Sequence, residues 1–382
     1  MASLLSLFVS LIPFFSWPAA AASPARDGVV GVIYALGTPD LPPPKKVADA
    51  LVSAGVPRVL LIDPYPEGVA AFDSTGIRVT IGINNSHIPA IAKNSTEAFL
   101  WVGTNIQQPN VTVEAVSLGY SVYNGYPDLA PLLLPALKNL HTALTKADID
   151  VPVTTCNSYD LVGSGFPPSK AEFNKSLAAT YVKPLLAFLN STRSPFLTDA
   201  FPIKLYRSGV VKLTSTGVLN FGADESSYLT DDATGLTYSN LFDSMVDAVV
   251  TAMTKLGYDD IPVVVSGTGW PSVGASNEPE ASVLYAAEYN ERLVVKQNMR
   301  EGTPLRPGTT PLAYIYALFD DPRNKGDEFE GNWGIWTAEL QQKYTIDFNP
   351  MNRGVGGRGL PGKKLLFAGW IVWVVFFSFF CE

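Results

Sequence analysis

Short apolar runs alternate with longer amphipathic stretches through most of this 382-residue chain, and that alternation limits the possible folds more than any other feature. It is typical of proteins in which helices cover a parallel sheet. Eight runs have the length and composition of strands: Val29–Tyr34, Arg58–Ile62, Arg78–Ile83, Glu114–Leu118, Val151–Thr155, Phe196–Phe201, Ile261–Ser266 and Leu312–Leu318. Helical patterns lie between them: Lys45–Ala54, Leu132–Lys146, Lys170–Leu189, Asn240–Leu256 and Ala281–Met299.

Eight such units predict an α/β fold, a single-domain (β/α)8 TIM barrel over residues 28–350. The segment Lys204–Thr237 contains many Gly, Ser and Asp residues and predicts an irregular excursion after the sixth strand. In these barrels the reactive groups lie where strands end and loops begin. We therefore look for a site first at the ends of the fourth and seventh predicted strands.

The first part of the chain has the composition of a secretory signal. Leu4–Trp17 is apolar, and Pro18 and a run of small residues follow it. This order predicts a signal peptide over residues 1–22, and a first buried helix is the alternative. Five acceptor sequons also fit an extracellular route. Their asparagines are Asn84, Asn94, Asn110, Asn174 and Asn190.

The last part of the chain resembles a lipid-attachment signal. An apolar run, Leu365–Phe380, follows a polar spacer and a stretch of small residues. This order predicts glycosylphosphatidylinositol (GPI) attachment at Asn352, a stalk over residues 351–364 and a removed hydrophobic signal over residues 365–382. A transmembrane anchor is the alternative, but its flanking lysines would lie outside the cell, against the positive-inside rule. The sequence thus predicts a protein at the outer face of the plasma membrane.

Charge and composition exclude several kinds of partner. A net charge of −8 and a pI near 4.9 leave no basic surface for the phosphates of nucleic acid. Two histidines and two cysteines are too few for a metal centre or a disulfide framework, so we expect no metal and no cofactor. Cys156 is interpreted as a small buried residue.

Several separate motifs occur in one order along the chain. They are Gly31–Tyr34 (GVIY), Asn240–Ala248 (NLFDSMVDA), Val263–Ser272 (VVVSGTGWPS), Ala317–Asp321 (ALFDD) and Glu330–Trp336 (EGNWGIW). Together they resemble the plant β-1,3-glucanases of glycoside hydrolase family 17 over nearly all of residues 28–350. The resemblance implies a TIM barrel and β-1,3-glucan as substrate.

The resemblance also implies a retaining mechanism, in which two carboxyl groups about 5–5.5 Å apart act as acid and nucleophile. The family's acid lies in a G-N-E-V segment, which reads Gly119-Tyr120-Ser121-Val122 here. Its nucleophile lies in V-S-E-T-G-W-P-S, where this chain has Gly267. Ser121 and Gly267 therefore occupy both carboxylate positions, and neither side chain can perform that chemistry. Whether the chain is an enzyme is left open by these two replacements.

Other residues could still bind a glycan or assist catalysis. Aromatic rings stack on sugar faces, and polar groups hold sugar hydroxyls. The candidates near predicted strand ends are Tyr34, Tyr120, Trp270, Phe319 and Trp336. Asp321, Lys325 and Glu330 match further active-site positions of the family. The acids Asp63, Glu278 and Glu280 are the remaining possible substitutes for the lost pair.

Two classes of function follow from these residues. The first is a catalytically inactive, glycan-binding cell-surface protein on a family 17 barrel, with β-1,3-glucan or a related wall polysaccharide as partner. The second is an active retaining β-1,3-glucan hydrolase or transglycosylase with unusual catalytic residues. A barrel with a closed groove and a protein partner is a third reading, which the solvent exposure of Tyr120 and Trp270 tests.

Overall fold

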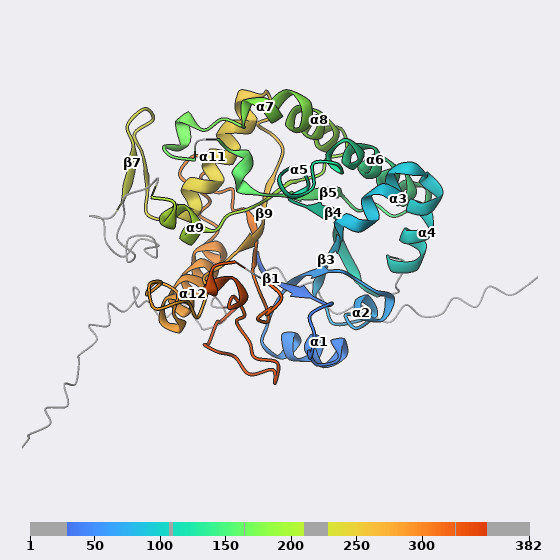
Figure 1. Cartoon of the computed structure of the whole chain (residues 1–382), viewed down its shortest axis with the longest axis horizontal. Helices are drawn as coiled ribbons and strands as arrows, with labels where there is room; N and C mark the ends of the chain where they lie inside the picture. The colour runs from blue at the N-terminus through green and yellow to red at the C-terminus, as the bar shows by residue number, and fades with distance from the viewer. Residues whose placement is uncertain (1–28, 107–109, 164, 210–227, 325, 350–382) are drawn as a thin grey trace, which may run out of the picture. The chain divides into compact units, whose positions relative to one another are not determined.

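Eight parallel strands form a closed barrel with helices around it (Figure 1), which confirms the predicted (β/α)8 barrel. This computed structural model describes residues 29–106, 110–163, 165–209, 228–324 and 326–349. The order around the barrel is β1 (Val30–Ala35), β10 (Leu312–Ile315), β9 (Val263–Thr268), β6 (Phe196–Asp199), β5 (Val153–Asn157), β4 (Thr112–Tyr120), β3 (Arg78–Ile83) and β2 (Arg58–Ile62).

The helices follow the strands along the chain and lie outside the barrel (Figure 1). They are α1 (Pro44–Ser53), α2 (Pro66–Ala70), α3 (Ile88–Lys93), α4 (Ser95–Asn105), α5 (Val122–Gly125), α6 (Ala130–Lys146), α7 (Lys175–Leu177), α8 (Lys183–Ser191), α9 (Pro202–Arg207), α11 (Leu241–Lys255) and α12 (Val283–Met299). Asn240 and Ser282 cap α11 and α12 by accepting a backbone N–H bond with their side chains. Such caps satisfy donors that have no partner within the helix.

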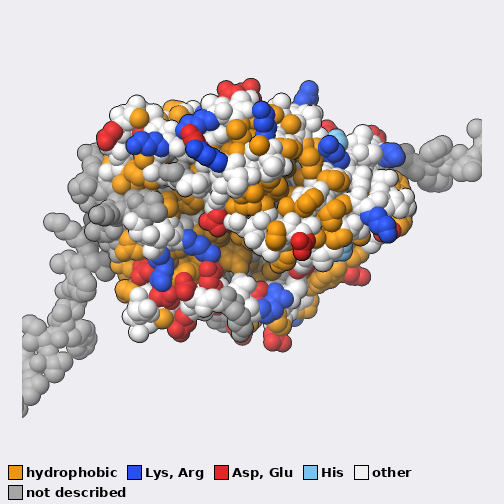
Figure 2. Space-filling view, turned by 45° about the horizontal axis from the view of Figure 1, so that its top comes forward, with side chains coloured by type: hydrophobic (Ala, Val, Ile, Leu, Met, Phe, Trp, Pro, Cys, Tyr) orange, Lys and Arg blue, Asp and Glu red, His pale blue; other side chains and the backbone are white. Residues whose placement is uncertain are grey.

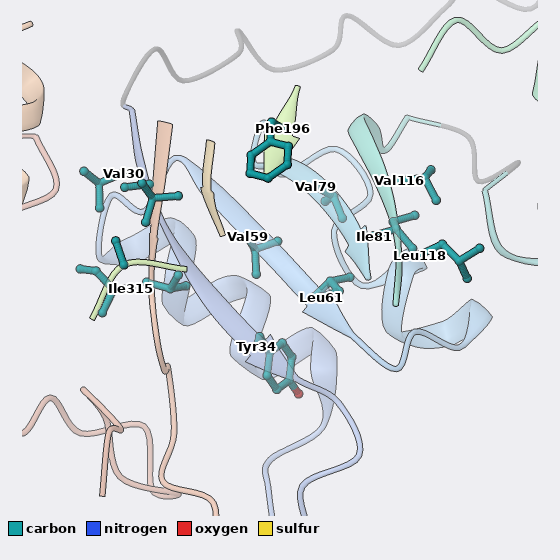
Figure 3. Close-up of a cluster of buried hydrophobic side chains, with 14 of the residues drawn as sticks. Val30, Tyr34, Val59, Leu61, Val79, Ile81, Val116, Leu118, Phe196 and Ile315 are labelled. Atoms are coloured by element: carbon teal, nitrogen blue, oxygen red, sulfur yellow. The ribbon is translucent and has the colours of Figure 1, made fainter. Parts of the chain in front are cut away.

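Alternate residues of each strand face opposite sides of the barrel wall, as the two-residue period of a strand requires. Val59 and Leu61 of β2 belong to the large core between strands and helices, as do Val79 and Ile81 of β3 (Figure 3). Leu60, between the first two, belongs instead to a small separate cluster with Ile33 and Tyr314. The wall is therefore packed on both of its sides.

A polar group of side chains closes the barrel at the N-terminal ends of its strands. Arg58 forms an ion pair with Glu114, and both side chains are largely buried. The Tyr314 hydroxyl lies 2.7 Å from a Glu114 oxygen and 2.7 Å from the Thr80 hydroxyl. A Cβ added to Gly31 would lie 2.8 Å from atoms of both Arg58 and Tyr314, so only glycine fits between them. We call Arg58, Thr80, Glu114 and Tyr314 the barrel floor.

Two predicted segments differ in detail. The predicted helix Lys170–Leu189 begins later, because Asn174 caps α7, and a π-helical turn at Ala178–Val182 connects α7 to α8. The predicted excursion contains α9 and a hairpin of β7 (Leu229–Asp231) and β8 (Leu236–Tyr238), which projects away from the barrel in Figure 1. Residues 210–227 of the excursion lie outside the described residues.

The predictions for the two ends of the chain lie outside the described residues. This holds for the signal peptide (1–22), the stalk (351–364), Asn352 and the hydrophobic segment 365–382. Within the part that the structure describes, no helix has the length and apolar character needed to cross a bilayer.

Candidate functional site at the barrel mouth

Ser121 follows the last residue of β4 and takes a left-handed backbone conformation, with φ of 47°. This region is uncommon for a residue with a side chain. Two backbone bonds hold the conformation: the Ser121 N–H donates to the Cys156 carbonyl at 3.0 Å, and the Gly125 N–H donates to the Ser121 carbonyl. The backbone at Ser121, the predicted acid position, is therefore held by β5 and α5 through its own amide groups.

Gly267 lies inside β9, opposite Asp199 of β6 in the strand register. The Ala200 N–H donates to its carbonyl at 2.8 Å. A Cβ at this position would lie 3.3 Å from Cζ of Phe201 and 3.7 Å from Cδ1 of Ile33. Two hydrophobic side chains thus border the space beside Gly267, the predicted nucleophile position.

Phe201 belongs to a cluster of aromatic rings, which we call the aromatic box and define as Phe201, Tyr316 and Trp333. The Phe201 and Trp333 centroids are 5.0 Å apart, and Tyr316 lies 5.9 Å from each of them. The Lys204 ammonium lies 5.3 Å from the Phe201 centroid and 5.9 Å from that of Trp333. These edge-to-face rings and the cation form a packed group at the end of β9.

Tyr120 differs from the aromatic box in its exposure to solvent. Its side chain is 53% exposed, although its hydroxyl donates a hydrogen bond of 3.0 Å to Oδ2 of Asp199. Asn85 accepts a bond from the Tyr120 N–H and donates one to the Tyr120 carbonyl, at 2.8 and 3.0 Å. The ring is held at its backbone and at its hydroxyl while much of its surface stays in contact with water.

Asp199 is the buried partner of that tyrosine, at the C-terminal end of β6. Its side chain is only 6% exposed, and its Oδ1 accepts the Tyr159 N–H at 2.8 Å. Burial raises the pKa of Asp199 to about 6, although its hydrogen bonds from Tyr159 and Tyr120 and the charge of Lys204 act in the opposite direction. Although about half of the Tyr120 surface is exposed, burial of its hydroxyl and then the negative charge of Asp199 hold the pKa of Tyr120 above its ordinary value.

The other acidic candidates near the mouth form ion pairs. Arg323 donates to both oxygens of Asp321, at 2.9 and 2.7 Å, and this hydrogen bonding lowers the pKa of Asp321. Lys204 lies 2.9 Å from Glu330. Two further pairs share one arginine: Arg207 with Glu278 at 3.0 Å and with Glu280 at 2.7 Å. Each of these four carboxylates therefore already has a cationic partner.

Several aromatic candidates lie in the core instead of the groove. Trp270 is 0% exposed and donates its indole N–H to the Glu280 carbonyl at 2.7 Å. Tyr34, Phe319 and Trp336 are also buried, and the Tyr34 and Phe319 rings contact each other edge to face. These four side chains pack where the strand ends meet the surrounding segments, so they present no open face to a sugar. Lys325 lies outside the described residues.

The structure adds residues that the sequence analysis did not select. They lie at the end of the sixth strand or just after it: Asp199, Phe201 and Lys204. The sequence predicted a site only at the ends of the fourth and seventh strands. Applying the strand-end rule to all eight strands would have included Asp199.

In Figure 2 the face of the molecule is hollowed near its middle, with hydrophobic side chains inside and acidic and basic side chains along one edge.

Comparison with known proteins identifies the family. The family model for glycosyl hydrolases family 17 matches residues 30–348. This chain belongs to glycosyl hydrolase family 17. Family 17 relatives in Arabidopsis thaliana include glucan endo-1,3-beta-glucosidase 12, 32% identical over 91% of this chain and 64% of its own length. Glucan endo-1,3-beta-glucosidase 2 is 36% identical over 85% of this chain and 65% of its own length. The chain thus spans slightly less than two thirds of these two relatives.

Solved structures agree with the family 17 assignment. CJP38, a beta-1,3-glucanase and allergen of Cryptomeria japonica pollen, has a TM-score of 0.78 and 30% identity, covering 84% of this chain and 98% of CJP38. A plant beta-glucan endohydrolase has a TM-score of 0.73 and 31% identity, covering 83% of this chain and 100% of the endohydrolase. The described barrel therefore corresponds to nearly the whole of these two family 17 structures.

Proposed function

We propose that this family 17 protein binds β-1,3-glucan at the barrel mouth and does not hydrolyse it. The names of its relatives support the substrate class. The observation that carries the proposal is the Tyr120 ring, half exposed beside the acid position and fixed by Asp199. An aromatic ring with one open face and little freedom to move is the kind of group that stacks on a sugar.

The replacements at both carboxylate positions support the absence of hydrolysis. A serine hydroxyl does not donate a proton near neutral pH, and a glycine has no atom with which to attack an anomeric carbon. At the nucleophile position, Phe201 and Ile33 border the place that a carboxylate side chain would enter. The acidic residues Asp321, Glu330, Glu278 and Glu280 are engaged by cations.

One observation favours the second function, an active hydrolase or transglycosylase. Asp199 has a pKa of about 6, in the range of carboxylic acids that donate protons in glycosidases. Both of its oxygens already accept hydrogen bonds, however, and its side chain is buried. We therefore assign Asp199 the role of anchoring Tyr120.

The proposal includes a location. The signal-like N-terminal segment, the GPI-attachment pattern around Asn352 and the five sequons support a lipid-anchored protein on the outer face of the plasma membrane. There it would meet wall polysaccharide. Release of the protein from intact cells by a phosphatidylinositol-specific phospholipase tests the anchor, and retention on the membrane after that treatment would favour the transmembrane alternative.

Calorimetry with laminari-oligosaccharides tests binding. The wild type should release heat at millimolar ligand, and Tyr120→Ala should weaken binding by about tenfold, as loss of one aromatic contact of about 1–1.5 kcal/mol implies. Tyr126→Ala is the matched control, because Tyr126 is 51% exposed and lies nearby in sequence. Absence of heat from the wild type, or equal loss in both variants, contradicts the binding proposal.

A reducing-end assay with linear β-1,3-glucan tests the absence of hydrolysis. The purified protein should release no more reducing ends than buffer alone. Turnover that Asp199→Asn abolishes would instead establish the second function, with Asp199 as the proton donor. Asp321→Asn and Glu330→Gln answer the same question for the two acids at further family active-site positions.

A further inference from the structure

A pocket of about 240 Å³ lies at the ends of β2 and β3, apart from the Tyr120 ring. Asp63 and Pro64 line it from the end of β2, and Trp101 lines it from α4. The end of β3 and the segment after it supply the remaining lining residues: Ile83, Asn84, Ser86 and His87. The pocket therefore combines one indole ring with several polar side chains.

Asn84 is both a wall of this pocket and the acceptor asparagine of the sequon Asn84-Asn85-Ser86. Its side chain is exposed. Its Oδ1 accepts the Ser86 N–H at 2.9 Å, which caps the short turn before α3. The cap uses the oxygen of the amide, whereas an N-linked glycan is attached to the nitrogen. Both can therefore be present at once.

We propose that Asn84 is N-glycosylated and that its first N-acetylglucosamine occupies the Trp101 pocket. In the attachment step, Nδ2 of Asn84 loses a proton and forms a bond to C1 of the sugar. The bond from C1 to the diphosphate of a lipid-linked oligosaccharide donor breaks, and the lipid diphosphate leaves. Because the sugar is attached to a residue that lines the pocket, it is held close to the other lining residues.

The lining suits one amino sugar. The volume of about 240 Å³ lies below the roughly 300–1,000 Å³ of sites for drug-sized molecules, so it suits a single ring. The Trp101 indole provides an apolar face for stacking, while Asp63, Ser86 and His87 offer partners for hydroxyl and acetamido groups.

Asn94 provides an internal control. It is also an exposed sequon asparagine, and its Oδ1 accepts the Thr96 N–H at 2.8 Å in the same local arrangement. It does not line the Trp101 pocket. The two sites therefore share sequon, cap and exposure but differ in the pocket.

Site-resolved deglycosylation of the full chain, secreted by a eukaryotic host, tests the proposal. Native protein is treated with a peptide amidase that removes N-glycans, and conversion of each asparagine to aspartate in heavy-oxygen water is followed by mass spectrometry. We expect Asn84 to be occupied and to lose its glycan at least tenfold more slowly than Asn94. Trp101→Ala should bring the Asn84 rate close to that of Asn94, and the exposed Phe99→Ala on the same helix should not.

Two further variants keep the test decisive if Trp101→Ala does not fold. Ser86→Ala and Thr96→Ala remove the two sequons while leaving both asparagines and their caps. Loss of the Asn84 glycan should lower the melting temperature by about 2 °C, and loss of the Asn94 glycan should not. An unoccupied Asn84, or equal release at Asn84 and Asn94 in the wild type, overturns the proposal. Neither result depends on glucan binding or hydrolysis, although the proposal shares the expected secretory route.

Discussion

At the end of β4 a single tyrosine ring stands half exposed over a buried carboxyl group, whereas at the end of β9 a packed aromatic box borders a glycine. The first arrangement keeps polar bonds and contact with water, through Tyr120 and Asp199. The second fills space with hydrophobic side chains, so that Phe201 lies 3.3 Å from a Cβ placed on Gly267. The surroundings of the two predicted carboxylate positions, Ser121 and Gly267, thus differ in character.

Under the proposed function, this difference separates binding from catalysis within one site. The solvent-exposed Tyr120 ring offers a surface for a sugar, whereas Phe201 and Ile33 border the space at Gly267, where the family's nucleophile is expected. The comparison predicts that substitutions on the β9 side act mainly on stability. Those on the β4 side should act mainly on ligand affinity.

The largest expected effect comes from removing Phe201. Phe201→Ala should lower the free energy of unfolding by about 3–5 kcal/mol, because it empties space among Tyr316, Trp333 and Ile33. Tyr120→Ala should cost only about 1 kcal/mol, since half of that side chain is already exposed and one hydrogen bond is lost. Chemical denaturation of both variants measures the difference, and equal losses would mean that the two strand ends are equally packed.

A smaller effect should appear as a pH dependence caused by Asp199. Because burial raises its pKa from 3.8 to about 6, folded Asp199 binds a proton more tightly than unfolded Asp199. Its contribution to stability is fully present below about pH 4 and is lost as the pH rises through 6. Between pH 4 and pH 7 the wild type should lose about 2 kcal/mol relative to Asp199→Asn.

Denaturation curves of the two proteins at several pH values check this prediction. Asp247 is also buried and its pKa is also raised to about 6, but it is present in both proteins and cancels in the comparison. Parallel curves for the wild type and Asp199→Asn would mean that Asp199 keeps an ordinary pKa. That result would also weaken its assignment as the anchor of Tyr120.

The smallest effect concerns Gly267 itself. Gly267→Ala should cost about 1 kcal/mol, because the added methyl group requires Phe201 to move by a few tenths of an ångström. Gly125→Ala is the matched control, since a Cβ at Gly125 meets no atom within 4 Å. If Gly267→Ala is as stable as its control, Phe201 moves aside readily. Ser121→Glu combined with Gly267→Glu would then be a practical way to ask whether the barrel can regain hydrolysis.

Much of the fold could be predicted from the sequence because each strand is a compact apolar run next to a helix boundary. β2 and β3 have the predicted ends. β6 ends at Asp199, two residues earlier than predicted, where its register against β9 shifts. The interruption near Ala178 could not be foreseen, since the amphipathic pattern continues through the π-helical turn.

The site was predictable only where a motif fixes a position in the chain. Ser121 and Gly267 could be located from short segments around them. The bond between Tyr120 and Asp199 could not, because it joins β4 to β6 across the end of β5 and depends on the direction of one side chain. Trp270 was selected from the same motif as Gly267, yet its side chain turns into the core next to Tyr289.

The barrel floor makes the stability of the barrel less dependent on the residues at its mouth. Arg58, Thr80, Glu114 and Tyr314 tie β2, β3, β4 and β10 together at the end of the barrel away from the mouth. These side-chain bonds hold the strands together whichever side chains lie at the C-terminal ends of the strands. A barrel held together at this end can accept substitutions at the opposite end without losing its overall architecture.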